Sequence, residues 1–298
     1  MKRSWFFIYA VSVASVAWGS YSTEQIKEWK KQAVEQNWTF DVNENPSDEI
    51  PLEQGTGLVV PENWESLAPW RTVTTDEVLP AKFDWREKGI GLNVKNQGRC
   101  GSCWAFGTVA AMEGAIKLAT GRDVVIAEQQ LVNCRPSFGS CGGGYFALGF
   151  YKEKGANYEN DFPYVARNGR CKSGIDGHEK VKEGAEVGQR GREPSTEELK
   201  SAIHRFGPVG VTVSVSGAFS GYKSGVYNAC TQRSTNHIVA LVGWNDEDQT
   251  WIMKNSWGEK WGEKGFMRIR YTNARGAKCN RVAQSAVYGV YSEEQEGK

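Results

Sequence analysis

The stretch NQGRCGSCWAF at residues 96–106 constrains this chain most, because it places Cys100 and Cys103 three residues apart directly before an apolar run. Cysteines at this spacing have three common uses: a redox dithiol, half of a zinc site, or one nucleophile beside a sulfur held in a disulfide. Each use makes a different demand on the rest of the 298 residues. The remaining sequence therefore decides among them.

The N-terminus predicts that the chain is secreted. MKRSWFFIYAVSVASVAWGS begins with Lys2 and Arg3, continues with an apolar segment, and places small residues at Ala17 and Gly19. This is typical of a cleaved signal peptide over residues 1–19, and the apolar run is too short to predict a stable membrane span. Secretion implies an oxidising or acidic compartment, outside the cell or in a lysosomal or vacuolar lumen, where disulfides persist.

Seven cysteines follow the predicted signal peptide. An odd number in a secreted chain leaves at least one thiol unpaired or paired between chains, and spacing alone does not say which. The formal net charge of +1 argues against a nucleic-acid partner.

Residues 20–80 differ from the rest of the chain. They contain no cysteine, twelve acidic and four basic residues, a net charge of −8, whereas residues 81–298 carry +7. Ser22 and Gln25 fit a capping box that opens a short helix, and the Pro- and Gly-containing acidic segment after Asn45 is typical of an extended strap. We expect a propeptide held on a basic catalytic domain partly by opposite charge, a hold that protonation of its carboxylates would weaken at low pH.

The first half of residues 81–298 reads as helical. A helix is predicted over residues 103–120, with Ser102 as its N-cap and Gly121 as its stop. Two shorter helical segments follow near residues 127–132 and 146–153.

The second half changes to the period of β-strands. Ser195 and Glu198 form a capping box before a helix that ends at Gly207. Residues 209–215 then alternate valine with small or polar residues, which predicts a half-buried strand. NHIVALVGW, TWIMKNSW and GFMRIRY predict further strands, so the whole is an α+β unit.

The zinc and redox interpretations meet difficulties. A zinc site needs about four ligands, and although Cys134 and Cys141 offer a second pair, no histidine lies at finger spacing from a cysteine. A redox dithiol should follow a core strand of a βαβ unit, but GIGLNVKNQGR before Cys100 is rich in glycine and polar residues. The dithiol–disulfide oxidoreductase remains the second candidate.

The nucleophile interpretation suits Cys103. A thiolate is the reactive form of cysteine, and its pKa falls at a helix N-terminus and beside an imidazolium. Cys103 follows the predicted cap Ser102 and lies in the first turn of the helix, whereas Cys100 lies before the helix, so the helix would lower its pKa less.

A base and an orienting group complete this interpretation. Of the three histidines, His178 lies in a charged loop, His204 lies on a predicted surface helix, and His237 opens an apolar strand. His237 is therefore the best base. Asn255 has the amide oxygen that would hold the imidazole in the right tautomer, and Trp257 would keep water from that hydrogen bond.

These residues together resemble the papain-like cysteine proteases. The local pattern Cys-Gly-[Ser/Ala]-Cys-[Trp/Tyr] with His and Asn far downstream is that family's own, and here His237 and Asn255 follow Cys103 by 134 and 152 residues. The resemblance runs from about Leu79 to Val290 and includes LPAKFDWREKG, SCGGGYF and KNSWGEKWGEKGF. It implies two subdomains, one helical (about 88–187) and one an antiparallel β-barrel (about 188–290), with the active site in the cleft between them.

The resemblance also implies residue roles. Cys103 is the nucleophile, His237 the general acid/base, Asn255 its orienting group, and Gln97 joins the Cys103 backbone N–H in an oxyanion hole. The activity implied is cysteine endopeptidase, without cofactor or metal. The disulfides implied are Cys100–Cys141, Cys134–Cys171 and Cys230–Cys279.

Substrate contacts are implied in the same way. Gly143 and Gly144 would pair with an extended peptide, and Trp257 would line the cleft. The pocket residues implied are Tyr145, Phe146, Thr212, Ile238 and Gln284. The amide of Gln284 at the pocket floor suggests tolerance for polar or basic side chains.

The expected partners are peptide and protein substrates, the chain's own propeptide as inhibitor and protein inhibitors of the cystatin type, with the enzyme a monomer. A short pro-region resembles the cathepsin B-like branch, yet that branch's histidine pair has no counterpart here. Endopeptidase activity is therefore favoured over carboxydipeptidase activity.

Overall fold

The computed structural model describes residues 23–45, 50–135, 139–172 and 177–291, so the predicted signal peptide and Ser22 of the first predicted capping box lie outside the described residues. The helices in these ranges are α1 (Thr23–Glu35), α2 (Leu52–Gly55), η2 (Trp64–Ser66), η3 (Trp85–Lys88), α3 (Cys103–Thr120), α4 (Glu128–Cys134), α5 (Leu148–Lys154), α6 (Thr196–Phe206), α7 (Gly217–Ser220) and η4 (Cys279–Arg281). The strands are β1 (Thr39–Val42), β2 (Trp70–Arg71), β3 (Lys82–Asp84), β4 (Gly139–Ser140), β5 (Gly143–Gly144), β6 (Val181–Val187), β7 (Val209–Val213), β8 (Tyr222–Tyr227), β9 (His237–Asn245), β10 (Thr250–Lys254), β11 (Phe266–Arg270) and β12 (Ala286–Tyr291).

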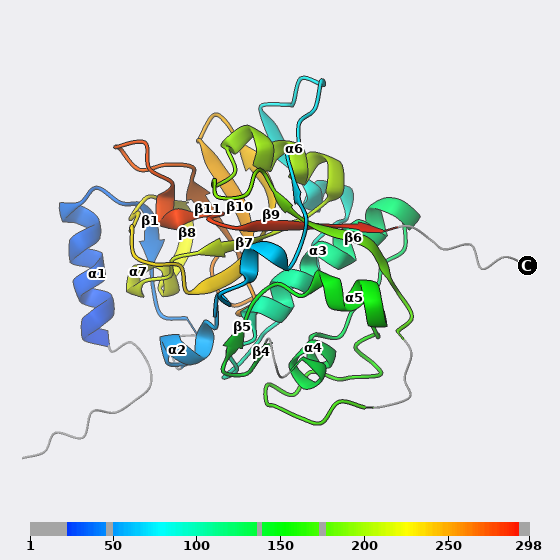
Figure 1. Cartoon of the computed structure of the whole chain (residues 1–298). Coiled ribbons are helices and arrows are strands. Elements are labelled where there is room, and N and C mark those ends of the chain that lie inside the picture. The colour runs from blue at the N-terminus through cyan, green and yellow to red at the C-terminus, as the bar shows by residue number, and fades with distance from the viewer. Residues whose placement is uncertain (1–22, 46–49, 136–138, 173–176, 292–298) are drawn as a thin grey trace, which may run out of the picture.

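Helix α3 is buried around most of its circumference and ends where the sequence predicts. It runs from Cys103 to Thr120, and Gly121 follows in the left-handed conformation (φ 73°). Gly107 and Gly114 allow close packing, because a Cβ there would lie 2.3 Å from Ile238 and 2.2 Å from Pro208. The helix thus lies directly against the sheet, with α4 and α5 on the same side of the molecule (Figure 1).

The large sheet of the described residues has ten strands. Its order is β1-β8-β11-β10-β9-β7-β12-β6-β2, and β3 pairs with β9 off this path. Most pairs are antiparallel, but β8–β11 and β2–β6 are parallel. The predicted α+β class is confirmed.

Two expectations about the sheet need correction. The pairing path stays open between β1 and β2, so the strand pairs of the described residues do not close into an antiparallel barrel. Strand β7 was expected to be half-buried, but all five of its residues are buried. The reason is that α3 and Phe146 cover its small-residue face, where Gly210 approaches both Phe146 and the Gly107 carbonyl.

The boundary between the two predicted subdomains also differs. β6 falls within the range expected to be helical, yet it pairs along its length with β12. Its sequence VKEGAEV holds two glutamates and a glycine, which are rare in strands, so local propensity hides it.

Residues 23–80 add both end strands to the sheet. β1 pairs antiparallel with β8 at one end, and β2 pairs in parallel with β6 at the other. Figure 1 shows α1 at one side of the molecule beside β1, while the segment after α2 crosses the front of the molecule. The segment expected to be an extended strap is largely extended and contains the short helices α2 and η2.

The buried apolar residues form two clusters that meet at the start of α3 and of β9. One cluster contains most of the sheet with Trp257 and Trp261. The other contains Cys103, α4, α5 and Ile238. Within the described ranges, no helix is long and apolar enough to cross a membrane.

Candidate active site

Cys103 is the free cysteine of the described residues, and it is fully buried. It is the first residue of α3, and its sulfur lies within reach of the backbone N–H groups of Ile238, Trp104 and Cys103 itself. Desolvation by burial outweighs these donors and raises the pKa of the thiol to about 12. In this covered state Cys103 is a neutral thiol.

The other six cysteines form disulfides. The pairs are Cys100–Cys141, Cys134–Cys171 and Cys230–Cys279. These are the pairs that the family resemblance implies. Because Cys100 is bonded to Cys141, it does not form a dithiol pair with Cys103, which contradicts the oxidoreductase alternative.

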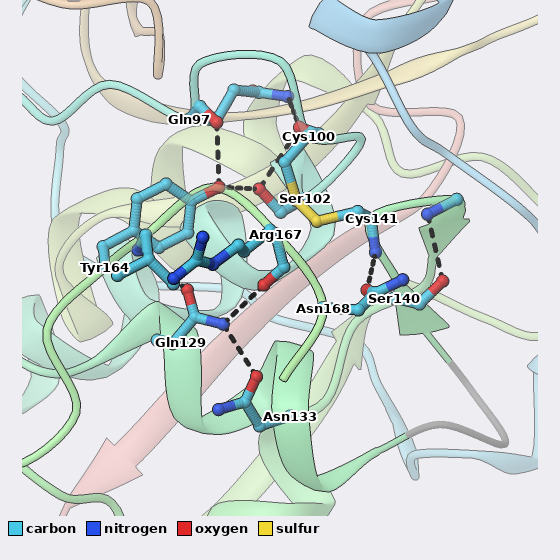
Figure 2. The surroundings of a disulfide bond; sticks show 12 residues. Gln97, Cys100, Ser102, Gln129, Asn133, Ser140, Cys141, Tyr164, Arg167 and Asn168 are labelled. Atoms are coloured by element: carbon cyan, nitrogen blue, oxygen red, sulfur yellow. Dashed lines mark hydrogen bonds between the residues drawn. A yellow bond between two sulfur atoms is a disulfide. The ribbon is translucent and has the colours of Figure 1, made fainter. Parts of the chain in front are cut away.

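Ser102 occupies the N-cap position of α3, but its side chain makes no capping hydrogen bond, contrary to the sequence prediction. Its hydroxyl lies 2.6 Å from the Tyr164 hydroxyl, which also donates to the Gln97 carbonyl at 2.9 Å (Figure 2). Tyr164 lies 62 residues along the chain, so only the tertiary fold brings it here. It ties the start of α3 to the loop segment that carries Gln97.

His237 and Asn255 form the second part of the site. His237 opens β9, Asn255 follows β10, and His237 Nε2 lies 2.9 Å from Asn255 Oδ1. With the proton on Nε2 the imidazole donates to the amide oxygen, which leaves Nδ1 buried without a hydrogen-bond partner among the described residues. Trp257 packs on the imidazole with ring centroids 5.1 Å apart.

Burial lowers the pKa of His237 to about 4, although the Asn255 hydrogen bond raises it. The sequence led us to expect a thiolate–imidazolium pair, but both groups are neutral here. The physical reason is that water is excluded from the two side chains, which disfavours both charged forms. The other histidines lie elsewhere: His178 stacks on Tyr158 and His204 packs on Phe83.

Gln97 lies beside the thiol-bearing segment and is fully buried. Its Nε2 donates to the Cys100 carbonyl at 2.9 Å and approaches the Thr56 carbonyl at 3.4 Å. Its Oε1 accepts from the Ser256 hydroxyl at 2.6 Å, which fixes the amide orientation. The Gln97 amide therefore points its N–H toward a carbonyl of residues 23–80.

The loop segment that carries Gln97 is held by a buried ion cluster. Lys95 Nζ lies 2.9 Å from Glu113 Oε1 on α3 and 2.8 Å from Glu128 Oε1 on α4. Burial alone would lower the pKa of Lys95, but the two carboxylates outweigh it and raise the pKa. The cluster fixes this segment against the helical side of the site.

Residues 55–59 cross the site as a peptide would. Gly144 donates its N–H to the Gly57 carbonyl at 2.9 Å and accepts from Val59 N–H at 3.0 Å, in parallel pairing. The Asn236 carbonyl accepts from the N–H groups of Gly57 (3.2 Å) and Leu58 (3.1 Å). Trp257 Nε1 donates to the Gly55 carbonyl at 2.7 Å.

This crossing requires glycine on both sides. Gly57 has φ 147°, and a Cβ there would lie 2.1 Å from the Gly101 carbonyl oxygen. Gly143 has φ 116°, and a Cβ there would lie 2.6 Å from Val59. Bare backbone thus lets residues 55–59 lie directly over the CGSC loop.

A cavity of about 140 Å³ opens beside Gly144. Its lining residues are Val60, Trp64, Tyr145, Thr212, Thr235, Gln284 and Ser285. Three of the pocket residues implied by the resemblance, Tyr145, Thr212 and Gln284, lie here. Phe146 and Ile238 instead belong to the core cluster of α3.

Three residues contribute to the site or its cavity but were not predicted from the sequence. Asn236 binds the covering segment through its carbonyl, while its amide bonds the Val215 backbone. Ser285 and Thr235 line the cavity. Each acts through backbone geometry or a distant partner, so no local sequence signal marks them.

Comparisons with known proteins agree with this geometry. A sequence profile described as "Papain family cysteine protease" matches residues 79–290. Cysteine proteinase COT44 of Brassica napus is 39% identical over 236 residues, which cover 73% of this chain and 67% of that protein. Germination-specific cysteine protease 1 of Arabidopsis thaliana is 37% identical over 231 residues, 71% of this chain and 58% of that protein.

Among solved structures, the digestive procathepsin L2 proteinase from Tenebrio molitor larval midgut matches with a TM-score of 0.79 and 28% identity. The match covers 90% of this chain and 89% of that chain. Against the two plant relatives, this chain spans about two thirds or less of their length.

Proposed function

Because the chain belongs to the papain family of cysteine proteases, we propose that it is an endopeptidase made as an inactive precursor. Residues 1–19 are a secretory signal, residues 20–80 the propeptide and residues 81–298 the catalytic domain. The enzyme acts after secretion or in a lysosomal or vacuolar lumen. Val78, in the exposed loop between β2 and β3, is 99% exposed, which supports processing near residue 80.

One observation carries the proposal. The free thiol of Cys103 lies next to the Ile238 N–H, and the neighbouring His237 bonds to Asn255 while keeping Nδ1 without a partner among the described residues. Residues 55–59 contact the neighbours of these side chains, namely Gly101, Asn236 and Trp257. A histidine oriented by an amide oxygen, adjacent in sequence to the residue whose N–H reaches a single free thiol, supports a cysteine peptidase precursor.

The chemistry follows from these groups. Once the propeptide leaves, water returns and the proton of Cys103 passes to His237, giving a thiolate and an imidazolium. The thiolate attacks the peptide carbonyl, and Gln97 Nε2 with the Cys103 N–H stabilises the oxyanion. His237 then protonates the leaving amine, and as a base it activates the water that hydrolyses the thioester.

The pairing of residues 57–59 with Gly144 supports the propeptide as the intrinsic inhibitor and Gly143–Gly144 as a contact for extended substrates. We further propose that Trp257, Tyr145, Thr212 and Gln284 contact substrate, that the mature enzyme is a monomer, and that cystatin-type inhibitors occupy the same cleft. The chain's three histidines include no adjacent pair, which favours endopeptidase over carboxydipeptidase activity.

The test compares the matured wild-type enzyme with Cys103→Ala on an internally quenched peptide. Because the thiolate forms the covalent intermediate, we expect Cys103→Ala to lower kcat/KM by about four orders of magnitude or more, with disulfide content and circular dichroism unchanged. Peptide cleavage that survives in Cys103→Ala contradicts the proposal. So does disulfide reductase activity that requires both Cys100 and Cys103.

A further inference from the structure

A buried carboxyl group lies behind the cavity beside Gly144. Glu186, in β6, is 1% exposed, and its side chain reaches two residues that line the cavity. Its Oε1 lies 3.2 Å from the Tyr145 hydroxyl and its Oε2 2.8 Å from the Ser285 hydroxyl. The two hydroxyls lie 2.6 Å from each other. Glu186, Tyr145 and Ser285 therefore form a closed three-membered cluster, which we call the pocket-floor cluster.

The number of protons in the pocket-floor cluster decides what it can bind. Three oxygen–oxygen contacts need three protons, and a protonated Glu186 with two hydroxyls supplies three. An ionised Glu186 leaves two protons for three contacts, so one acceptor lacks a donor. The ionised cluster thus demands a donor from outside, and the open side is the cavity.

Among the described residues, no cationic side chain is found that acts on Glu186. The groups of the described structure that act on its pKa are Ser285, Tyr145 and the Ala286 backbone N–H. Desolvation outweighs these hydrogen bonds and raises the pKa to about 7. A carboxylate without a counter-ion gains most from a positively charged donor.

The propeptide covers the pocket-floor cluster. Trp70 pairs with Glu186 across β2 and β6, and the Glu186 N–H donates to the Pro69 carbonyl at 2.9 Å. Trp64 lies over Tyr145 with ring centroids 6.0 Å apart and also lines the cavity. Departure of this segment opens the cavity to solvent and to a substrate side chain.

We propose that Glu186 is a specificity-determining positioning residue, which acts through Tyr145 and Ser285 to select substrates with Lys or Arg at the second residue before the scissile bond. The proposal rests on the endopeptidase function proposed above. A cationic side chain in the cavity supplies the missing donor and the missing charge together. An aliphatic side chain supplies neither and leaves the ionised cluster short of a donor.

The test uses two fluorogenic peptides that differ only at that position, Arg against Leu, at neutral pH. Enzyme concentration is set by titration of Cys103 with iodoacetamide. In Glu186→Gln we expect the Arg/Leu ratio of kcat/KM to fall about tenfold or more, because the neutral amide removes the negative charge behind Tyr145 and Ser285, while the Leu value stays within about twofold. Glu186→Asp should restore part of the Arg preference.

Glu183→Gln is the matched control, because Glu183 lies on the same strand and pairs with Arg71 of the propeptide rather than with the cluster. Its Arg/Leu ratio should equal that of the wild type. If Glu186→Gln does not mature, Ser285→Ala is measured in its place, since it removes one hydroxyl between Glu186 and the cavity. An unchanged Arg/Leu ratio in the variant measured overturns the inference. Failure of the wild type to cleave either peptide instead overturns the proposed function.

Discussion

Two parts of residues 23–80 contact the rest of the chain by different physical means. The first part, residues 23–45 (the anchor), buries Ile26, Trp29, Phe40 and Val42 and adds the four-residue β1. The second part, residues 50–80 (the strap), has a two-residue strand, several backbone contacts and few buried side chains. The anchor is held mainly by apolar burial, whereas the strap is held mainly by polar contacts over the active site.

We therefore expect the anchor to set how tightly residues 23–80 bind, and the strap to set whether substrate can reach the active site. Apolar burial is insensitive to pH and salt, so the anchor should keep the propeptide bound when the strap opens. The strap carries the pH-sensitive contacts because it covers Cys103, His237 and Glu186.

Trp29→Ala should lower the stability of the precursor more than the other substitutions do. Trp29 is 5% exposed and lies on the bare backbone of Gly217 and Gly221. Removal of a buried aromatic ring costs about 3–5 kcal/mol, so the thermal stability of the Cys103→Ala precursor should fall and its propeptide should be lost first. Lys30→Ala, at the exposed neighbour, is the control and should leave the melting temperature unchanged. Equal melting temperatures for the two variants would show that burial of the anchor is not the main interaction that binds residues 23–80.

Gly57→Ala should open the strap without loosening the anchor. A Cβ at Gly57 would lie 2.1 Å from the Gly101 carbonyl oxygen, and φ 147° disfavours any side chain. We expect a cost of about 1–3 kcal/mol and iodoacetamide labelling of Cys103 in the precursor that is about ten times faster. Gly276→Ala, also at positive φ but with nothing within 4 Å, is the control for backbone strain alone. Labelling at the wild-type rate in Gly57→Ala would refute the close fit.

Protonation of His237 at acidic pH should favour an open strap, whereas protonation of Glu186 should favour the covered state. The covered His237 has a pKa near 4 against an ordinary 6.5, so the covered state is favoured above pH 6.5 and loses that preference as the pH falls toward 4. The covered Glu186 has a pKa near 7 against an ordinary 4.5, so it favours the covered state below pH 4.5 and less as the pH rises through 7.

The two opposed shifts are about equal, so in the wild type they nearly cancel between pH 6.5 and 4.5, whereas in Glu186→Gln the His237 shift acts alone and we expect propeptide cleavage to accelerate as the pH falls from 6.5 toward 4. The measurement is cleavage of the Cys103→Ala precursor by a fixed amount of an added protease, normalised at each pH to an unfolded substrate. Cleavage of the Glu186→Gln precursor that is as fast at neutral as at acidic pH contradicts this account.

Glu65→Gln should have the smallest effect. Glu65 of the strap pairs with Arg190 at 2.8 Å, but both side chains are partly exposed. Such pairs contribute about 0–1 kcal/mol, so cleavage of the precursor should change by less than about fivefold. In the pair of Arg71 with Glu183, the residue from the strap is the cation. The direct contacts therefore do not all follow the difference between the net charge of −8 in residues 20–80 and +7 in residues 81–298. A larger change in precursor cleavage in Glu65→Gln would indicate that attraction between opposite charges is the main interaction that binds the strap.

Local signals predicted part of this structure and failed where distant partners decide. The range of α3 and the capping box of Ser195 with Glu198 follow from neighbouring residues, and both are confirmed. Ser102 occupies the predicted N-cap position, but its hydroxyl contacts Tyr164, 62 residues away, and makes no capping hydrogen bond.

The candidate site divides in the same way. Cys103, His237 and Asn255 stand out by residue type and spacing, and the structure brings them to the start of α3 and β9. Glu186 lies in a strand with little β-propensity, and its partners Tyr145 and Ser285 are 41 and 99 residues away. No local pattern could have connected them.

The two end strands supplied by residues 23–80 have a consequence for the mature enzyme. Their departure leaves β8 and β6 with unpaired backbone groups, which is how sheets of separate molecules join and precipitate. Lys223 in β8, and Lys182 with Glu183 in β6, place charge along these two newly bare margins. If residues 20–80 are removed as proposed, these charged side chains would disfavour edge-to-edge association at the two strands where the segment lay.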